Sequence, residues 1–190
     1  SRGLGDVYKR QYSFCMCPGG QVIAAASEAG GVCTNGMSVY ARDGQNANSA
    51  LLVDVRTQDF PDAHPLSGLT MQRQWEQAAF AAGGGDYRAP AQRAEDFLHD
   101  RASRALGDVT PTYRPGVTMA DLRAVLPAYA AAGLKGGIQI FARQLRGFDH
   151  PDAVLTGVEA RSSSPTRTVS TAITNLSQYF MINTNRIHVL

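Results

Sequence analysis

The chain has 190 residues, of which 44% are hydrophobic and 18% charged, a balance typical of one globular domain or parts of two. No apolar run approaches the roughly 18 residues of a membrane-spanning helix. No apolar segment of the signal-peptide kind follows the first residues, so we expect no secretory signal. The net charge of +2 comes from the ends, because residues 12–165 hold 13 basic and 15 acidic residues. We therefore expect no nucleic-acid partner and no membrane partner. An odd number of cysteines, three, favours a reducing, cytoplasmic setting.

Both ends of the chain differ in composition from its middle. The coding sequence implied by residues 6–11 resembles a transposase end used in sequencing libraries, so we interpret residues 1–11 as translated adaptor from a metagenomic assembly. No glycine occurs after residue 165, although 19 precede it, and half of the isoleucines fall in this tail. We interpret residues 166–190 as a non-native tail produced by a frameshift or a chimeric join. The alternative is a genuine terminal strand, because residues 179–182 and 187–190 have strand-like composition.

Hydrophobic patterning predicts strands in the first part of the body. Residues 21–25 are typical of a short buried strand after a Pro-Gly-Gly turn, and residues 32–40 of an irregular segment or a strand edge. Residues 49–55 form the clearest predicted strand, and their nearly continuous apolar character predicts burial of both faces.

Helical patterns follow. Apolar residues at helical spacing from Met71 to Ala82 predict a helix that ends at the glycines 83–85. A second helix is predicted from about Pro90, and Thr118 to Asp121 resembles a capping box that opens a third. Pro127 is expected to break or restart that helix, and a further helix runs toward residue 147.

A last strand is predicted at 154–160. The order of elements predicts an α+β or mixed α/β enzyme domain, in which strands flank a helical insert at about 67–147 and a strand returns at about 153–160.

Residues that carry chemistry concentrate in the segment Cys15-Met16-Cys17-Pro18-Gly19-Gly20. The proline fixes φ, and the glycines let the backbone bend or approach a ligand closely. Cys15 and Cys17 would face opposite sides of a strand and would share a target only in a turn. They could be a redox pair, zinc ligands together with Cys33, or small packed side chains. The histidines show no paired ligand spacing, and we assign no metal.

Two further motifs are open to a structural interpretation. The glycines 83–85 follow a predicted helix, whereas a phosphate loop precedes one, so a helix stop is favoured. Neither a Gly-x-Gly-x-x-Gly nor a Gly-x-Ser-x-Gly motif is present. Arg161 and the serines 162–164 follow a strand and could bind a carboxylate or phosphate, or form a polar turn stopped by Pro165.

Several segments, taken in this order along the chain, resemble a bacterial family of FAD-dependent dehydrogenases, the NAD/FAD-utilising oxidoreductases. The matching residues are 12–20, 35–38, 42–43, 46–50, 87–92, 113–117 and 155–165.

The resemblance implies redox chemistry at FAD on a small-molecule substrate in the parent protein, with NAD(P)H as a candidate electron donor. The family's ADP-binding unit belongs before Tyr12, and the segment that closes over the flavin belongs after Pro165. We therefore expect a middle-to-C-terminal fragment that is inactive alone and binds FAD poorly. The rival interpretation is a non-catalytic α+β module that uses its helices for protein interaction.

By position, the resemblance implies that the Cys15–Gly20 and Arg161–Pro165 turns face the flavin. Cys15 and Cys17 are the catalytic candidates, because a thiol can exchange electrons with a flavin. The predicted cofactor-binding residues are Pro18, Gly19, Gly20, Arg161, Ser163, Ser164 and Pro165, and the predicted substrate-binding residues are Asn35, Met37, Arg42 and Asn48.

Overall fold

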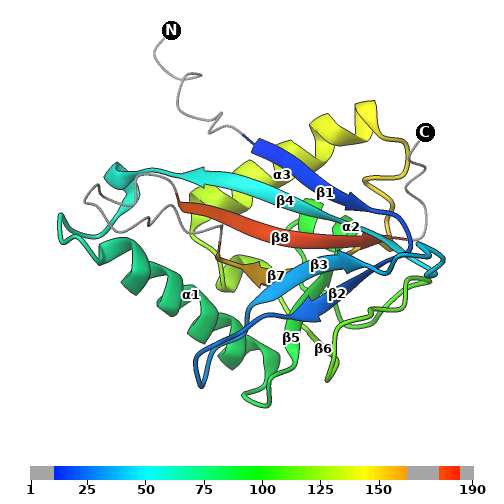
Figure 1. Ribbon diagram of the computed structural model, residues 1–190. Coiled ribbons are helices and arrows are strands. Elements are labelled where there is room, and N and C mark those ends of the chain that lie inside the picture. The colour runs from blue at the N-terminus through cyan, green and yellow to red at the C-terminus, as the bar shows by residue number, and fades with distance from the viewer. Residues whose placement is uncertain (1–10, 162–175, 185–190) are drawn as a thin grey trace, which may run out of the picture.

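A six-stranded, mostly antiparallel sheet with the strand order β1-β4-β8-β7-β5-β6 forms the centre of the protein, and a separate β2–β3 hairpin packs against it (Figure 1). This computed structural model describes residues 11–161 and 176–184. The strands of the sheet are β1 (Gln11–Cys17), β4 (Ala47–Val55), β5 (Ala89–Arg93), β6 (Val117–Met119), β7 (Val154–Glu159) and β8 (Leu176–Thr184), and the hairpin comprises β2 (Gly20–Ala24) and β3 (Thr34–Ser38).

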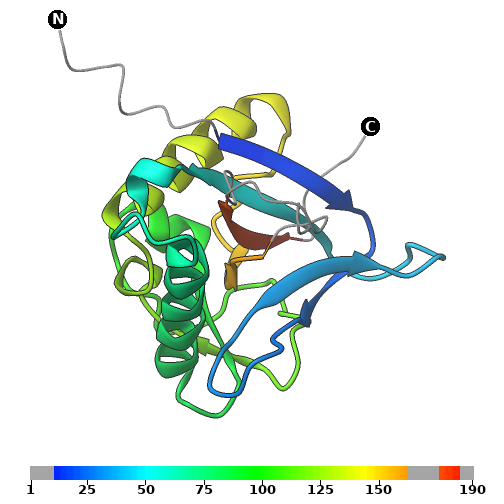
Figure 2. The same cartoon turned by 60° about the vertical axis from the view of Figure 1, so that its left-hand side comes forward.

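Helices α1 (Ser67–Gly83) and α3 (Ala128–Gln144) lie on one side of the molecule and the β2–β3 hairpin on the other (Figure 2). Helix α3 packs on β4 and β1, while β2 and β3 also contact β4. This double covering explains why almost all of β4 is buried and why its middle, residues 50–53, is continuously apolar. Shorter helical segments are η1 (Thr57–Asp59), α2 (Ala94–Leu98) and η2 (Leu122–Ala124). None of the helices within the described ranges is long and apolar enough to cross a bilayer.

These elements confirm the predicted α+β class, and the end of α1 confirms the role assigned to the glycine triplet. Gly84 has a left-handed φ of 106°, and its N–H donates to the Ala81 carbonyl at 3.1 Å. The N–H of Gly85 closes the turn on the Phe80 carbonyl at 2.9 Å. A left-handed residue of this kind is a standard helix stop, and glycine adopts it without strain.

The helix predicted from about Pro90 is wrong. Residues 89–93 form β5, which pairs with β6 on one side and with β7 on the other. Its pairing with β7 begins only at Ala91, so Pro90 lies before that ladder and its missing N–H is tolerated there. The helical spacing of Ala94 and Phe97 corresponds only to the five-residue α2, where both side chains are fully buried.

The capping box predicted at residues 118–121 is also wrong at Thr118, its first residue. Thr118 lies in β6, and its hydroxyl donates to the Gly83 carbonyl at 2.5 Å, which ties β6 to the end of α1. Asp121 does cap a helical turn, because its carboxylate accepts from the N–H of Arg123, but that turn is the short η2. The long helix starts after Pro127, as the restart at this proline predicts.

The segment predicted as a helical insert, about 67–147, therefore also supplies two strands of the main sheet. Residues 176–184 form β8 between β4 and β7, which agrees with the strand alternative for this part of the tail. The interpretation of 166–190 as non-native and of 1–11 as adaptor stays a prediction. Residues 1–10, 162–175 and 185–190 lie outside the described ranges.

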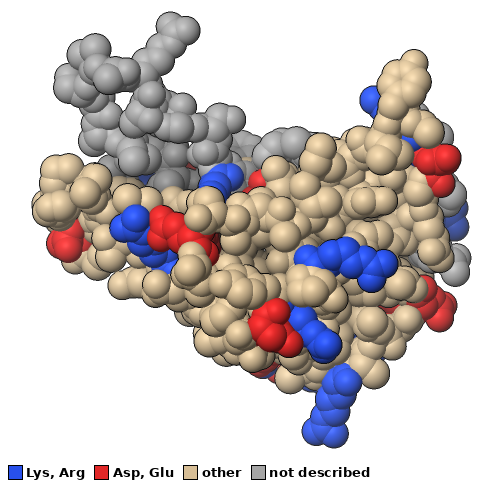
Figure 3. Space-filling view, turned by 60° about the horizontal axis from the view of Figure 1, so that its bottom comes forward, with Lys and Arg blue, Asp and Glu red and all other residues tan. Residues whose placement is uncertain are grey.

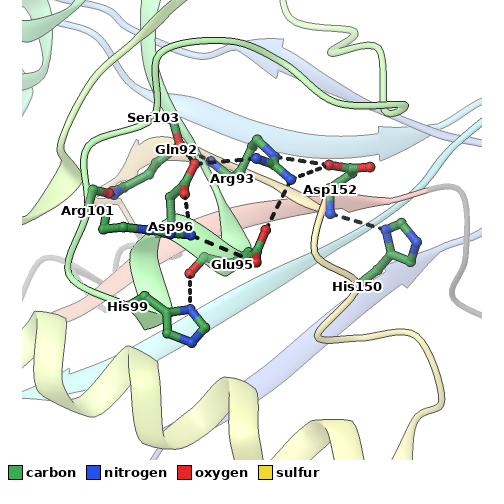
Figure 4. Close-up of polar contacts among 9 residues, drawn as sticks. All are labelled: Gln92, Arg93, Glu95, Asp96, His99, Arg101, Ser103, His150 and Asp152. Atoms are coloured by element: carbon green, nitrogen blue, oxygen red, sulfur yellow. Dashed lines mark hydrogen bonds and ion pairs between the residues drawn. The ribbon is translucent and has the colours of Figure 1, made fainter.

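A polar network fixes the corner where β5 meets α2 (Figure 4). Arg93 donates to Asp152 at 2.9 Å and lies 3.2 Å from Glu95, and its backbone N–H donates to the Ser103 hydroxyl. Ser103 in turn donates to Asp96 at 2.7 Å. These polar groups are paired with one another, so the network serves to hold the corner rather than to present a reactive group.

Gln92 anchors this network from the core and offers a stability test. Its side chain is fully buried, accepts from the Leu122 N–H at 2.8 Å and donates to the Arg101 carbonyl at 2.6 Å. The substitution Gln92→Leu leaves both backbone groups without these partners, so we expect the free energy of unfolding to fall by about 2–4 kcal/mol in urea denaturation. The exposed Gln139→Leu on α3 is the control, and an equal, small effect for the two variants would contradict the assignment.

Candidate functional site

The turn between β1 and β2 lies directly against the loop that precedes β4. Gly19 has a left-handed φ of 59°, and a Cβ at this position would overlap the Arg42 backbone carbonyl. A Cβ on Gly20 would overlap the side-chain amide of Asn48. Glycine is therefore required at both positions by close approach of the chain. The Pro-Gly-Gly motif of the sequence brings the 39–46 loop and β4 onto the end of the hairpin.

Asn48 joins three strands at this place. It is fully buried, it pairs with Cys17 across β1 and β4, and its Nδ2 donates to the Met37 carbonyl of β3 at 3.3 Å. Its Oδ1 is buried and has no partner among the described residues. Nearby, the Met37 side chain is 54% exposed, and Arg42 is exposed with a left-handed φ of 51°. We call Cys17–Gly20, Met37, Arg42 and Asn48 the turn site.

Other predicted residues of this region lie differently. Asn35 is exposed opposite Ile23 of the hairpin, and its Oδ1 accepts from the neighbouring Gly36 N–H at 2.7 Å. Cys17 is a half-buried free thiol at the last position of β1, so it belongs to a strand and not to a shared turn with Cys15. Cys15 lies within β1, but its side chain is outside the described part of the structure.

Arg161 lies at the other end of the hairpin, where it binds a buried acid. Its Nε and Nη2 donate to the two carboxylate oxygens of Glu76, each at 2.7 Å, and its Nη1 donates to the Ser27 hydroxyl. Glu76 belongs to α1 and is only 2% exposed. This hydrogen bonding to Glu76 raises the pKa of the Arg161 guanidinium. The predicted anion-binding arginine is thus already held by a carboxylate of the protein itself.

The two turns predicted to face the flavin are therefore separated by the length of a strand. Gly20 opens β2, whereas Ser27 follows the end of β2, and a strand rises about 3.4 Å per residue. Ser163, Ser164 and Pro165 lie outside the described residues. The roles predicted for Arg161 and for these residues stay predictions.

Burial sets the acid–base properties of two groups close to Arg161. Glu159, the last residue of β7, is 8% exposed, and burial raises its pKa to about 7. Its Oε2 has no partner within the described ranges. Burial raises the pKa of Cys33 to about 11, and the charges of Glu76 and Glu159 act in the same direction. Cys33 is thus a protonated thiol and a poor nucleophile at neutral pH, whereas Glu159 can hold or release a proton there.

The sequence analysis missed Glu76 and Glu159, although each carries a signal. Glu76 lies on the apolar face of α1 beside Trp75, and an acid on such a face needs a partner. Glu159 ends a strand that is otherwise apolar or small, which predicts burial of its carboxylate. No group of three or more His, Cys, Asp or Glu side chains in the described part of the chain is placed to hold a metal ion, so Cys33 has no zinc partners there.

Comparison with known proteins gives the family. A family model described as "FAD-dependent protein, C-terminal domain-like" matches residues 6–162, most of the chain. The chain belongs to this family. An uncharacterized protein of Clostridium beijerinckii is 51% identical over 156 residues, which make up 82% of this chain and 29% of that protein. The chain thus spans less than a third of the length of the curated relative that it matches.

The described residues do not fit the pyrophosphate half of the FAD that the family implies. A dinucleotide site places a glycine-rich turn between a strand and a helix N-terminus. Here the glycine triplet follows α1 instead of preceding it, and Pro127 precedes α3. Only β5 and β6 pair in parallel among the described strands, and the sheet around them is antiparallel.

The buried Glu159 predicts a specific pH dependence of stability. Its pKa in the folded protein, about 7, lies above the value near 4.5 of a solvated glutamate, so its contribution to stability is full below about pH 4.5 and is lost as the pH rises through 7. We expect the free energy of unfolding to drop by about 2–3 kcal/mol more between pH 5 and pH 8 in the wild type than in Glu159→Gln. Parallel pH profiles in urea denaturation would contradict this assignment.

Proposed function

We propose that this chain forms the substrate-side domain of an FAD-dependent oxidoreductase, a dehydrogenase that acts on a small molecule. The observation that carries the proposal is the family match over residues 6–162, which supports FAD dependence of the complete protein. The poor fit of the described residues to the pyrophosphate of FAD supports separate binding of cofactor and substrate. In this arrangement, another part of the complete protein holds FAD, and this domain contributes contacts to the substrate.

The turn site is the proposed substrate surface. Arg42 and Met37 are both exposed, and residues 38–42 line a hollow of about 530 Å³. A hollow of this size is within the range of small-molecule sites. A substrate with an anionic group would pair with Arg42, while its apolar part would lie against Met37 and Tyr40. The buried Asn48 would hold the site in place by its hydrogen bond to the Met37 carbonyl.

The charges on one face of the domain also support a small molecule over a polyanion as partner. On the face shown in Figure 3, basic and acidic side chains are interspersed, and no patch of a single sign gathers over the described residues. A nucleic-acid partner requires such a basic patch. The proposals that NAD(P)H donates electrons and that Cys15 or Cys17 exchanges electrons with the flavin rest on the family resemblance and on their sequence positions.

The absorbance of the purified proteins tests the proposal. We expect the complete Clostridium beijerinckii relative to purify yellow with bound flavin, and the 190-residue chain to purify colourless and to show no saturable quenching of FAD fluorescence. The reason is that this chain offers no strand-to-helix glycine turn to the pyrophosphate in its described part. Circular dichroism of both proteins is the control for folding.

Two outcomes would contradict the proposal in different ways. A folded, colourless relative would favour the alternative of a non-catalytic interaction module. Tight, stoichiometric binding of FAD by the 190-residue chain would show that this domain itself holds the cofactor.

A further inference from the structure

A hollow of about 350 Å³ opens beside the first turns of α3, and none of its lining residues belongs to the turn site. Its size falls within the range of small-molecule sites. Leu126 and the alanines 128, 131 and 132 form an apolar lining, because alanine side chains end at Cβ and leave room above the helix. The charged residues Asp100, Arg123 and Lys135 complete the lining. The hollow thus combines an apolar floor with a charged rim.

Two cations from different elements converge on one carboxylate oxygen at this rim. The Nη1 of Arg123 and the Nζ of Lys135 lie 2.9 Å and 2.5 Å from the Oδ1 of Asp100. Asp121 also binds Arg123, because its Oδ1 accepts a hydrogen bond from the Arg123 Nε at 2.8 Å. The spacing of the two cations is therefore one that a single carboxylate fills.

Asp100 is the most exposed of the three charged residues that line the hollow. Its side chain is 58% exposed, whereas the side chain of Lys135 is 22% exposed. It follows α2 at a left-handed φ of 58°. Hydrogen bonds from Lys135 and Arg123 lower the pKa of Asp100, so the group that occupies the cations is an anion. An exposed anion of this kind exchanges readily with an anion from solution.

The helix itself adds to the preference for an anion. Ala128, the first residue of α3, lines the hollow, and the preceding Pro127 has no side-chain acceptor for the first N–H groups of the helix. The N-terminus of a seventeen-residue helix carries partial positive charge.

We propose that this hollow binds a small monocarboxylate with an apolar body, whose carboxylate replaces that of Asp100 between Lys135 and Arg123. The apolar body lies on Leu126 and the alanines of α3. The proposal is independent of the flavin-linked function, because it concerns different residues and needs no cofactor.

Titration of benzoate into the 190-residue chain tests the proposal. We expect saturable shifts of the backbone amide resonances of Ala128, Ala131 and Lys135, with a Kd of about 1 mM for a ligand of this size. Benzyl alcohol has the same apolar body without the charge and is the probe control. It is expected to bind about tenfold more weakly, because it lacks the charge-assisted hydrogen bonds.

Two variants with opposite expected effects make the test specific. Lys135→Met keeps much of the side-chain length but removes one cation, and it should weaken benzoate binding about tenfold. Asp100→Asn removes the competing anion and should tighten binding by about threefold or more. Arg143→Met, at an exposed position near the other end of α3, is the matched control and should leave the Kd unchanged.

Thermal unfolding shows whether each variant folds. The binding measurement on Asp100→Asn tests the proposal even if Lys135→Met does not fold. Weaker binding to Asp100→Asn would mean that Asp100 belongs to the ligand's site instead of competing for it, and would overturn the proposal. Equal affinity for benzoate and benzyl alcohol, or no saturable shift in either the wild type or Asp100→Asn, would overturn it as well.

Discussion

The arrangement of this domain depends on one buried carboxylate, that of Glu76. An acid that is 2% exposed is costly unless it is fully paired, and here both of its oxygens accept from Arg161. The backbone carbonyl of Glu76 also accepts from the Val32 N–H at 3.0 Å. The same residue therefore ties α1 to the β2–β3 loop and to the chain that leaves β7. This one requirement for a partner fixes the position of the hairpin at its β2–β3 loop end.

The opposite end of the hairpin is fixed by close approach instead of by charge. Gly19 lies against the Arg42 backbone, and Asn48 donates to the Met37 carbonyl. Both ends are thus rigid, but they differ in what they leave accessible. At the Glu76 end, the cation is already paired with a carboxylate of the protein. At the turn site, Arg42 and Met37 are exposed, and this difference is why the proposed substrate surface is placed there.

The class of the fold and several elements could be predicted from sequence, because their signals are local. The apolar run of β4 and the glycine stop of α1 depend on neighbouring residues only. The predictions that rested on Pro90 and Thr118 were wrong. A proline near the start of a helix and one near the start of a strand have the same local pattern, and the pattern from Thr118 to Asp121 likewise does not distinguish a helix cap from a strand end. Long-range pairing decides in favour of strands, because Pro90 and Thr118 face each other across β5 and β6 and residues 91–93 of β5 pair with β7.

The glycines of the turn site could also be predicted from sequence, because segments that pack this closely require glycine, and adjacent glycines are visible in the sequence. Most of the site's chemistry could not, because it depends on contacts between distant segments. Arg161 and Glu76 are 85 residues apart, and no spacing rule joins them. The raised pKa of Glu159 likewise comes from burial, which only the packed structure determines.

A double-mutant cycle on Glu76 and Arg161 measures how strongly the buried carboxylate depends on its arginine partner. The variants Glu76→Gln, Arg161→Met and their combination are compared with the wild type by the free energy of unfolding in urea. We expect a coupling energy of about 2 kcal/mol for this pair with its buried carboxylate. The exposed pair Glu28–Arg73 nearby, at 2.8 Å, should show a clearly smaller coupling in the same cycle. A coupling energy for Glu76 and Arg161 no larger than that of the exposed pair would show that the position of the hairpin does not depend on this buried carboxylate.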